Sequence, residues 1–104
     1  MSRQFDVVAN PDSAEAAHRP YFVVLQSDLV SGLASTVIAP LVARADMTGA
    51  GRLNPIVVVD GREFWLATHE LFAADRRALG QTIASLSENR DAIIAAIDFV
   101  FTGF

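Results

Sequence analysis

Two short polar pairs are the residues of this sequence best suited to acid–base chemistry. His69-Glu70 is the one adjacent histidine–carboxylate pair, and His18-Arg19 is a basic pair of a kind that could cleave RNA. Such chemistry needs a further partner, either a nucleophile, a second base or a metal. The sequence spacing identifies none. We therefore interpret His69-Glu70 as a surface turn and His18-Arg19 as a loop end before a strand.

Other catalytic motifs are missing from the sequence. The hydroxyls of Ser27 and Ser31 have no Gly-x-Ser-x-Gly elbow around them, and Ser27-Asp28 is typical of a turn. The glycines of Gly49-Ala50-Gly51 lack the helix that a phosphate-binding loop requires. Lysine and cysteine are absent, which excludes Schiff-base chemistry and zinc–thiolate sites. We expect no catalytic residue, no metal and no cofactor.

Charge and composition limit the kinds of molecule that this chain could bind. The net charge is −4, and Arg76-Arg77 is the one basic cluster, so we expect DNA to be contacted only indirectly, through another protein. A chain of 104 residues, 52% of them hydrophobic, predicts a single domain over residues 1–104. Polar residues interrupt any signal-peptide core near the N-terminus, and no apolar stretch reaches the roughly 20 residues that span a bilayer. We therefore expect a cytoplasmic protein without membrane contact.

The first two thirds of the sequence predict β-structure. Short apolar runs bounded by turn residues predict strands at 5–9, 21–25, 36–39, 56–59 and 62–67. Asp60-Gly61 between the last two predicts a hairpin with a type I′ turn. Because 56–59 is apolar throughout, we expect both of its faces to be covered. The segments 10–19 and 47–54 are predicted loops, and 69–80 is compatible with helix or strand.

The end of the sequence predicts a helix. Ser85 and Glu88 fit a capping box, and Gly103 fits a C-terminal cap. Apolar residues recur at helical spacing, and we expect Ile93, Ile97 and Phe101 to pack into the core.

The last three residues fit a core less well. Phe104 brings a terminal carboxylate that resists burial, so we expect Thr102, Gly103 and Phe104 to contact a partner or a second copy.

In order and spacing, these pieces resemble the CcdB family, the toxins of CcdAB toxin–antitoxin modules. The similarity extends over nearly the whole chain and needs no gap from Leu86 to Phe104. The segments that carry it are Phe22-Val23 with Gln26-Ser27-Asp28-Leu29-Val30, Val37-Ile38-Ala39-Pro40-Leu41, Pro55-Ile56-Val57-Val58 with Trp65, Leu86-Ser87, and Ala96-Ile97 through Phe101 to Gly103.

The resemblance implies a mainly β fold with a C-terminal α-helix, an SH3-like small barrel or antiparallel sheet, assembled as a homodimer. It also implies that the protein is not an enzyme. Such a toxin binds the A subunit of DNA gyrase and traps its cleaved complex with DNA. A CcdA-like antitoxin neutralises it, and the two together repress their operon.

The resemblance also implies binding residues. The family binds gyrase through a terminal Trp-Gly-Ile preceded by Phe, which corresponds here to Phe101, Thr102, Gly103 and Phe104, with threonine in place of the tryptophan. For the antitoxin, the exposed loop 10–17 is a candidate, with Asn10, Asp12 and Glu15 as contacts. A plain solvated loop is an equal interpretation.

Two alternatives stay open. Loss of the tryptophan allows a CcdB-like protein that no longer poisons gyrase and acts only through antitoxin binding. The related MazF-like toxins share this architecture, which allows an endoribonuclease, although the acidic charge balance argues against RNA binding.

Overall fold

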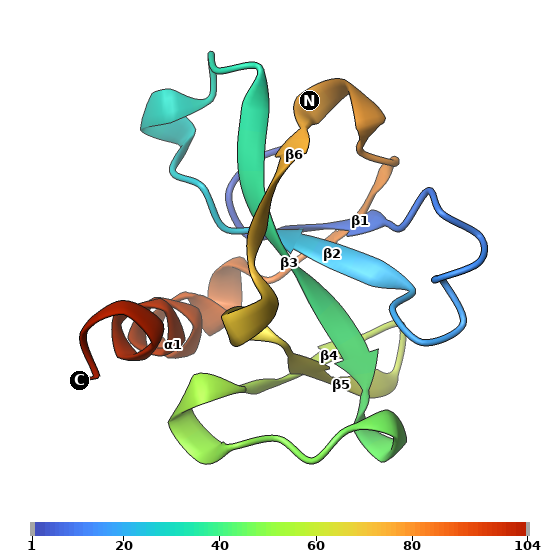
Figure 1. Cartoon of the computed structure of the whole chain (residues 1–104), viewed down its shortest axis with the longest axis vertical. Helices are drawn as coiled ribbons and strands as arrows, with labels where there is room; N and C mark the ends of the chain where they lie inside the picture. The colour runs from blue at the N-terminus through green and yellow to red at the C-terminus, as the bar shows by residue number, and fades with distance from the viewer. Residues whose placement is uncertain (1, 104) are drawn as a thin grey trace.

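A computed structural model describes residues 2–103, which form one curled antiparallel sheet with a helix on one side (Figure 1). The strands are β1 (Asp6–Ala9), β2 (Tyr21–Val24), β3 (Ser35–Ala43), β4 (Ile56–Val59), β5 (Arg62–Leu66), β6 (Phe72–Asp75) and β7 (Thr82–Ser85), and the helix is α1 (Arg90–Thr102). The sheet order is β4-β5-β3-β2-β1-β7, with β6 paired to β3. This curled half-barrel with one terminal helix confirms the predicted fold class. No helix in residues 2–103 is long and apolar enough to cross a bilayer.

The long strand β3 organises the sheet. One edge pairs with β2, and the other edge is shared between β6 along its first half and β5 along its second. The expected strand 36–39 therefore continues through Pro40 to Ala43. Pro40 lies inside this strand. Proline has no N–H to donate to the sheet, but the Pro40 carbonyl accepts a hydrogen bond from Ala67 N.

The hairpin prediction is confirmed. Asp60 and Gly61 have φ angles of 52° and 74°, the two positive values that a type I′ turn needs. The prediction that both faces of β4 are covered is wrong. Val57 and Val59 are buried while Ile56 and Val58 are exposed, because β4 ends the sheet and only one of its faces meets the core.

The segment 69–80 forms a strand, β6, between short 3₁₀ turns. One further strand, β7, was not predicted. Its sequence mixes polar and apolar residues, and it is extended because it pairs with β1, a contact between distant parts of the chain.

The predicted capping box is wrong. Ser85 ends β7, its hydroxyl accepts from Ser87 N at 3.2 Å, and a 3₁₀ turn over Ser87–Asn89 precedes the helix. The helix therefore begins at Arg90, with Asn89 at the cap position and no side-chain cap bond. Pairing of Ser85 with Asp6 holds it in the sheet, so local capping preference does not decide its conformation.

The core lies between the sheet and the first half of α1. Phe64, Leu66 and Ile93 are fully buried in it, and Leu86 belongs to the same buried cluster. Burying a large apolar side chain contributes about 1.5–3 kcal/mol. Packing of this kind therefore holds α1 on the sheet, and its second half extends beyond the covered area.

Candidate functional site

The second half of α1 exposes two phenylalanines on different faces of the helix, because residues two apart lie about 200° apart around its axis. Phe101 is 69% exposed and Phe99 38%, although Ile93 and Ala96 on the same helix are buried. The prediction that Phe101 packs in the core is wrong, because its ring borders an open hollow beside Leu25, Val37 and Leu71 and stays mostly in water. Ile93 is confirmed as a core residue, and Ile97 is half-buried against the core.

A small apolar hollow lies beside Phe101. It measures about 200 Å³ and is lined by Leu25, Gln26, Val37, Leu71, Ile97 and Phe101. Beside Phe101 and Ile97, the hollow is thus formed by Leu25 and Gln26 after β2, by Val37 of β3 and by Leu71 before β6. An apolar side chain of a partner could enter here without any rearrangement of the sheet.

The last helical turn has fixed geometry. Gly103 takes the left-handed conformation, with φ of 78°, and its N–H donates to Phe99 O at 3.0 Å. The predicted glycine cap is therefore confirmed. The Thr102 hydroxyl donates to Asp98 O at 2.7 Å, so its proton is used inside the helix. Phe104 lies outside the described residues.

A second exposed apolar group follows β2. Leu29 is 96% exposed, and Val30 and Leu33 near it are about half exposed. Leu29 N donates to Ser27 Oγ at 3.1 Å in a 3₁₀ turn. The sequence analysis did not predict a binding role for these residues. The signal that could have found them is the presence of apolar side chains inside a serine- and glycine-rich turn, where they are exposed. Gln26, which starts this turn, also lines the hollow beside Phe101.

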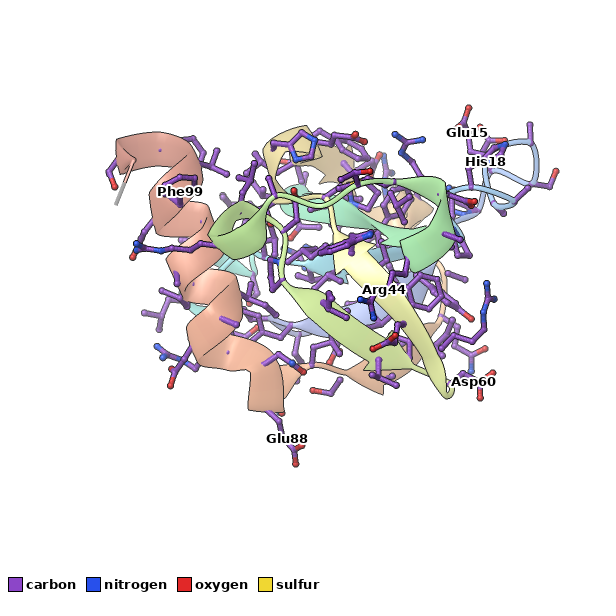
Figure 2. All side chains as sticks on the ribbon, turned by 90° about the horizontal axis from the view of Figure 1, so that it is seen from below. Glu15, His18, Arg44, Asp60, Glu88 and Phe99 are labelled. Atoms are coloured by element: carbon purple, nitrogen blue, oxygen red, sulfur yellow. The ribbon has the colours of Figure 1, made fainter. Side chains whose placement is uncertain are left out.

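The loop 10–19 lies on the other side of the molecule from α1. Figures 1 and 2 both show this loop, which carries Glu15 and His18, far from the helix that carries Phe99. The three predicted antitoxin contacts all line one groove of about 310 Å³, with Arg19, Phe22, Pro40, Glu70 and Phe72. The structure therefore brings Asn10, Asp12 and Glu15 together but separates them from the terminal residues.

His69-Glu70 is part of a hydrogen-bonded network that holds a turn. Buried Asn54 donates from Nδ2 to Leu66 O at 2.9 Å, and the same nitrogen lies 3.2 Å from His69 Nδ1. His69 Nε2 lies 3.7 Å from Glu70 Oε2, and Glu70 binds Arg19. This network holds a surface turn, as interpreted from the sequence.

His18 is exposed at the loop end, 4.0 Å from Asp46. Within residues 2–103, no three histidine or carboxylate side chains gather in a way that could hold a metal.

The basic cluster is tied to its surroundings. Arg77 binds the Asp75 carboxylate at 3.0 Å, and its side-chain and backbone hydrogen bonds hold the pKa of Asp75 below its usual value. Arg76 Nε donates to Leu33 O at 3.1 Å. Arg76 therefore fastens the loop after η1 (Asp28–Val30), and Arg77 pairs with neighbouring Asp75, so part of the donor capacity of both arginines is used inside the chain.

Comparison with known proteins places the chain in a family. The family model described as CcdB protein matches residues 4–103. No curated protein matches the sequence.

Solved structures share the fold at low sequence identity. One is an endoribonuclease in complex with its cognate antitoxin from mycobacterial species, with a TM-score of 0.77, 10% identity and coverage of 96% of this chain and 94% of that one. Another is the Mycobacterium tuberculosis toxin MazF-mt6, with a TM-score of 0.70, 16% identity and coverage of 95% and 96%. At these identities the likeness concerns the fold.

Proposed function

Since this chain belongs to the CcdB protein family, we propose that it is the toxin of a toxin–antitoxin pair and that it poisons the A subunit of DNA gyrase. Family membership supports the toxin role, and the fold shared with other toxins agrees with it. In this proposal the protein acts in the cytoplasm as a homodimer, is neutralised by a CcdA-like antitoxin, and represses its operon together with that antitoxin.

One observation carries the choice of target. The last turn of α1, at the family's gyrase-binding position, presents Phe101 to solvent beside an apolar hollow and is closed by Gly103. Exposed aromatic side chains beside a hollow are typical of the few residues that dominate binding energy at an interface. A structural role alone does not require an exposed phenylalanine at this position.

The threonine at position 102 changes how this surface would bind. Its hydroxyl donates to Asp98 O, so it offers a partner neither an aromatic ring nor a free donor proton. We propose that Phe101 and the apolar hollow beside it supply the contact area that the family's tryptophan supplies elsewhere. Phe99 lies on another face of the helix, under Arg52, whose guanidinium carbon lies 5.7 Å from the ring centre.

The test is a gyrase cleavage assay. The purified protein is incubated with supercoiled plasmid, ATP and gyrase, from the source organism and from a standard source, and linear DNA is measured. We expect linear DNA with the native protein and much less with Phe101→Ala. Glu88→Gln, at the other end of the helix region (Figure 2), is the control and should poison as the native protein does.

The first alternative is loss of poisoning. If linear DNA appears with neither gyrase and calorimetry detects no binding to the A subunit, the gyrase proposal fails. The protein would then act through antitoxin binding alone.

The second alternative is an endoribonuclease. The groove at loop 10–19 favours it in one respect, since it contains an arginine, Arg19, and two aromatic rings on which bases could stack. Charge opposes it, because Asp12 and Glu15 border the same groove and repel phosphates. Cleavage of a single-stranded RNA that Arg19→Ala abolishes, with gyrase unaffected, would establish this activity.

A further inference from the structure

We propose that the cavity between Ser2 and the β6–β7 connection binds a small phosphate ester, whose phosphate group is held by Arg76 and Arg77. The proposal goes beyond the toxin role and does not depend on it. We call this site the arginine pocket. Its volume is about 740 Å³, within the range of pockets that take a whole small molecule.

Three distant segments of the chain line the arginine pocket. They are Ser2, Ala34 just before β3, and residues of the stretch 76–82 that leads from β6 into β7. Arg76 N donates to Ala34 O at 2.9 Å, and the hydroxyls of Ser2 and Thr82 lie 3.3 Å apart. These bonds join all three segments, so the walls are formed before any ligand binds and less entropy is lost on binding.

The charged residues that line the arginine pocket are cations. Arg76 and Arg77 border it, and no carboxylate of residues 2–103 does. Asp75 pairs with Arg77 and Asp6 accepts from Thr82 Oγ1 at 3.5 Å, but both lie outside the lining. A ligand with complementary charge is therefore an anion.

Arg76 offers the better fixed donors. Its side chain is half-buried, and its Nε donates to Leu33 O at 3.1 Å, which orients the guanidinium. Within residues 2–103 it forms no ion pair, so both of its Nη groups are left for a ligand. A guanidinium held in this way presents a planar fork that matches two oxygens of a phosphate.

Arg77 can join the site at small cost. Its side chain is 91% exposed, and its Nη2 lies 3.0 Å from Asp75 Oδ2. An exposed ion pair of this kind contributes little to stability, because water screens both charges. A phosphate ester carries up to about two negative charges, so it attracts this guanidinium more strongly than the single charge of Asp75 does.

The remaining polar side chains favour a phosphate over a carboxylate. Ser2 and Thr82 bring hydroxyls to the lining, and Gln81 brings an amide. Together with the two guanidiniums they supply more donors than the two oxygens of a carboxylate can use. A phosphate offers a third acceptor oxygen.

Uncharged walls leave room for the rest of the ligand. Ala34, Leu79 and Gly80 complete the lining, and Leu79 is half-buried beside the cavity. The uncharged body of a phosphate ester can lie on these walls and remove apolar surface from water. Inorganic phosphate lacks such a body, so we expect the ester to bind more tightly.

A nucleic-acid strand fits the arginine pocket less well than a small molecule does. The net charge of −4 repels a polyanion, and Arg76-Arg77 is the one basic cluster of the sequence. A strand requires basic side chains along several phosphates, whereas a small ester requires them at one.

The experiment titrates small molecules into the full-length protein at constant ionic strength. The probes are adenosine monophosphate, inorganic phosphate, adenosine and acetate, and amide shifts in NMR spectra give the dissociation constants and the site. We expect adenosine monophosphate to bind most tightly and to shift amides of residues 76–82. Adenosine and acetate should bind about tenfold more weakly or less, because each lacks the phosphate.

Arginine variants test the two donors. Arg76→Gln should weaken binding of adenosine monophosphate about tenfold, because it removes the oriented guanidinium. Arg77→Gln should weaken it about threefold, because Arg77 must first leave Asp75. Arg77 is exposed and its replacement should not affect folding, so this variant decides the question if Arg76→Gln, which also loses the bond to Leu33 O, is unstable.

Arg44→Gln is the matched control. Arg44 is also a partly exposed arginine in an ion pair, with Glu63 at 2.8 Å. It follows the far end of the nine-residue strand β3, whereas Ala34 precedes its start (Figure 1). At about 3.3 Å per residue the two ends lie roughly 25–30 Å apart, so the control should bind adenosine monophosphate as the native protein does.

Several outcomes would overturn the proposal. Absence of binding by adenosine monophosphate would remove the site, and equally tight binding of acetate, adenosine or inorganic phosphate would contradict a phosphate ester as its ligand. Unchanged affinity in the Arg77 variant, or an equal loss in the Arg44 control, would place the ligand elsewhere. Displacement of adenosine monophosphate by a single-stranded oligonucleotide at equal phosphate concentration would assign the arginines to a nucleic acid.

Discussion

Both halves of α1 are mainly apolar, but their surroundings are opposite. In the first half Ile93 and Ala96 are fully buried, and Ile93 belongs to the core cluster with Phe64 and Leu66, whereas Phe101 in the last turn is 69% exposed. The first half faces the buried core, and the last turn borders an open hollow. An apolar helical repeat therefore predicts a face that needs a cover, and the tertiary structure decides whether the chain or a partner provides it.

The largest expected effect is on the buried half. Ile93→Ala removes a fully buried side chain from the centre of the core and should lower the free energy of unfolding by about 3 kcal/mol. Urea denaturation followed by circular dichroism measures it. A loss below about 1 kcal/mol would show that the first half of α1 is not the part that anchors the helix.

The next effect is on the exposed half. Phe101→Ala should change unfolding by less than about 0.5 kcal/mol, because this side chain is mostly in water. Affinity for the gyrase A subunit, measured by calorimetry, should fall by about 2 kcal/mol, or roughly 30-fold. A large loss of stability with unchanged affinity would reverse the comparison between the two halves.

Thr102→Trp tests whether the exposed half lacks an aromatic anchor. The substitution adds a large ring at an exposed position and breaks only the hydrogen bond to Asp98 O, so stability should hardly change. Gyrase affinity should rise by about 1–2 kcal/mol, and linear DNA should accumulate at lower protein concentration. Unchanged affinity would mean that Phe101 and its neighbours already fill the binding site. Thr102→Val, which removes the hydroxyl without adding a ring, is the control.

The smallest effect concerns the cap. At Gly103 a Cβ would meet no atom within 4 Å, so Gly103→Ala adds only the strain of a positive φ, about 1 kcal/mol. This should open the last turn and speed hydrogen exchange at the Gly103 amide, which is bonded to Phe99 O, and lower the melting temperature by no more than about 4–8 °C. A larger drop would show that the cap supports the whole helix.

Short sequence patterns correctly predicted those elements whose conformation depends only on residues close in the sequence. The Asp60-Gly61 turn and the Gly103 cap were predicted correctly, because each needs a positive φ that few residues tolerate. The cap at Ser85 and the covered faces of β4 were predicted wrongly, since β7 pairing and the edge position of β4 override local preference. For the site, the terminal residues and the exposed loop 10–17 could be named from the resemblance, but the exposure of Phe101 could not be predicted, because helical spacing groups it with the core residue Ile93.

The sequence by itself determined the family, the mainly β architecture, the terminal helix and the acidic charge. These depend on residue order, on periodicity and on composition. Only the tertiary structure decided that Phe101 is exposed, that Leu29 stands out from its turn, and that Asp12 and Glu15 share a groove with Phe72. Burial and proximity depend on which distant segments pack together, because the curled sheet brings residues separated by about 60 positions in the sequence to the same groove.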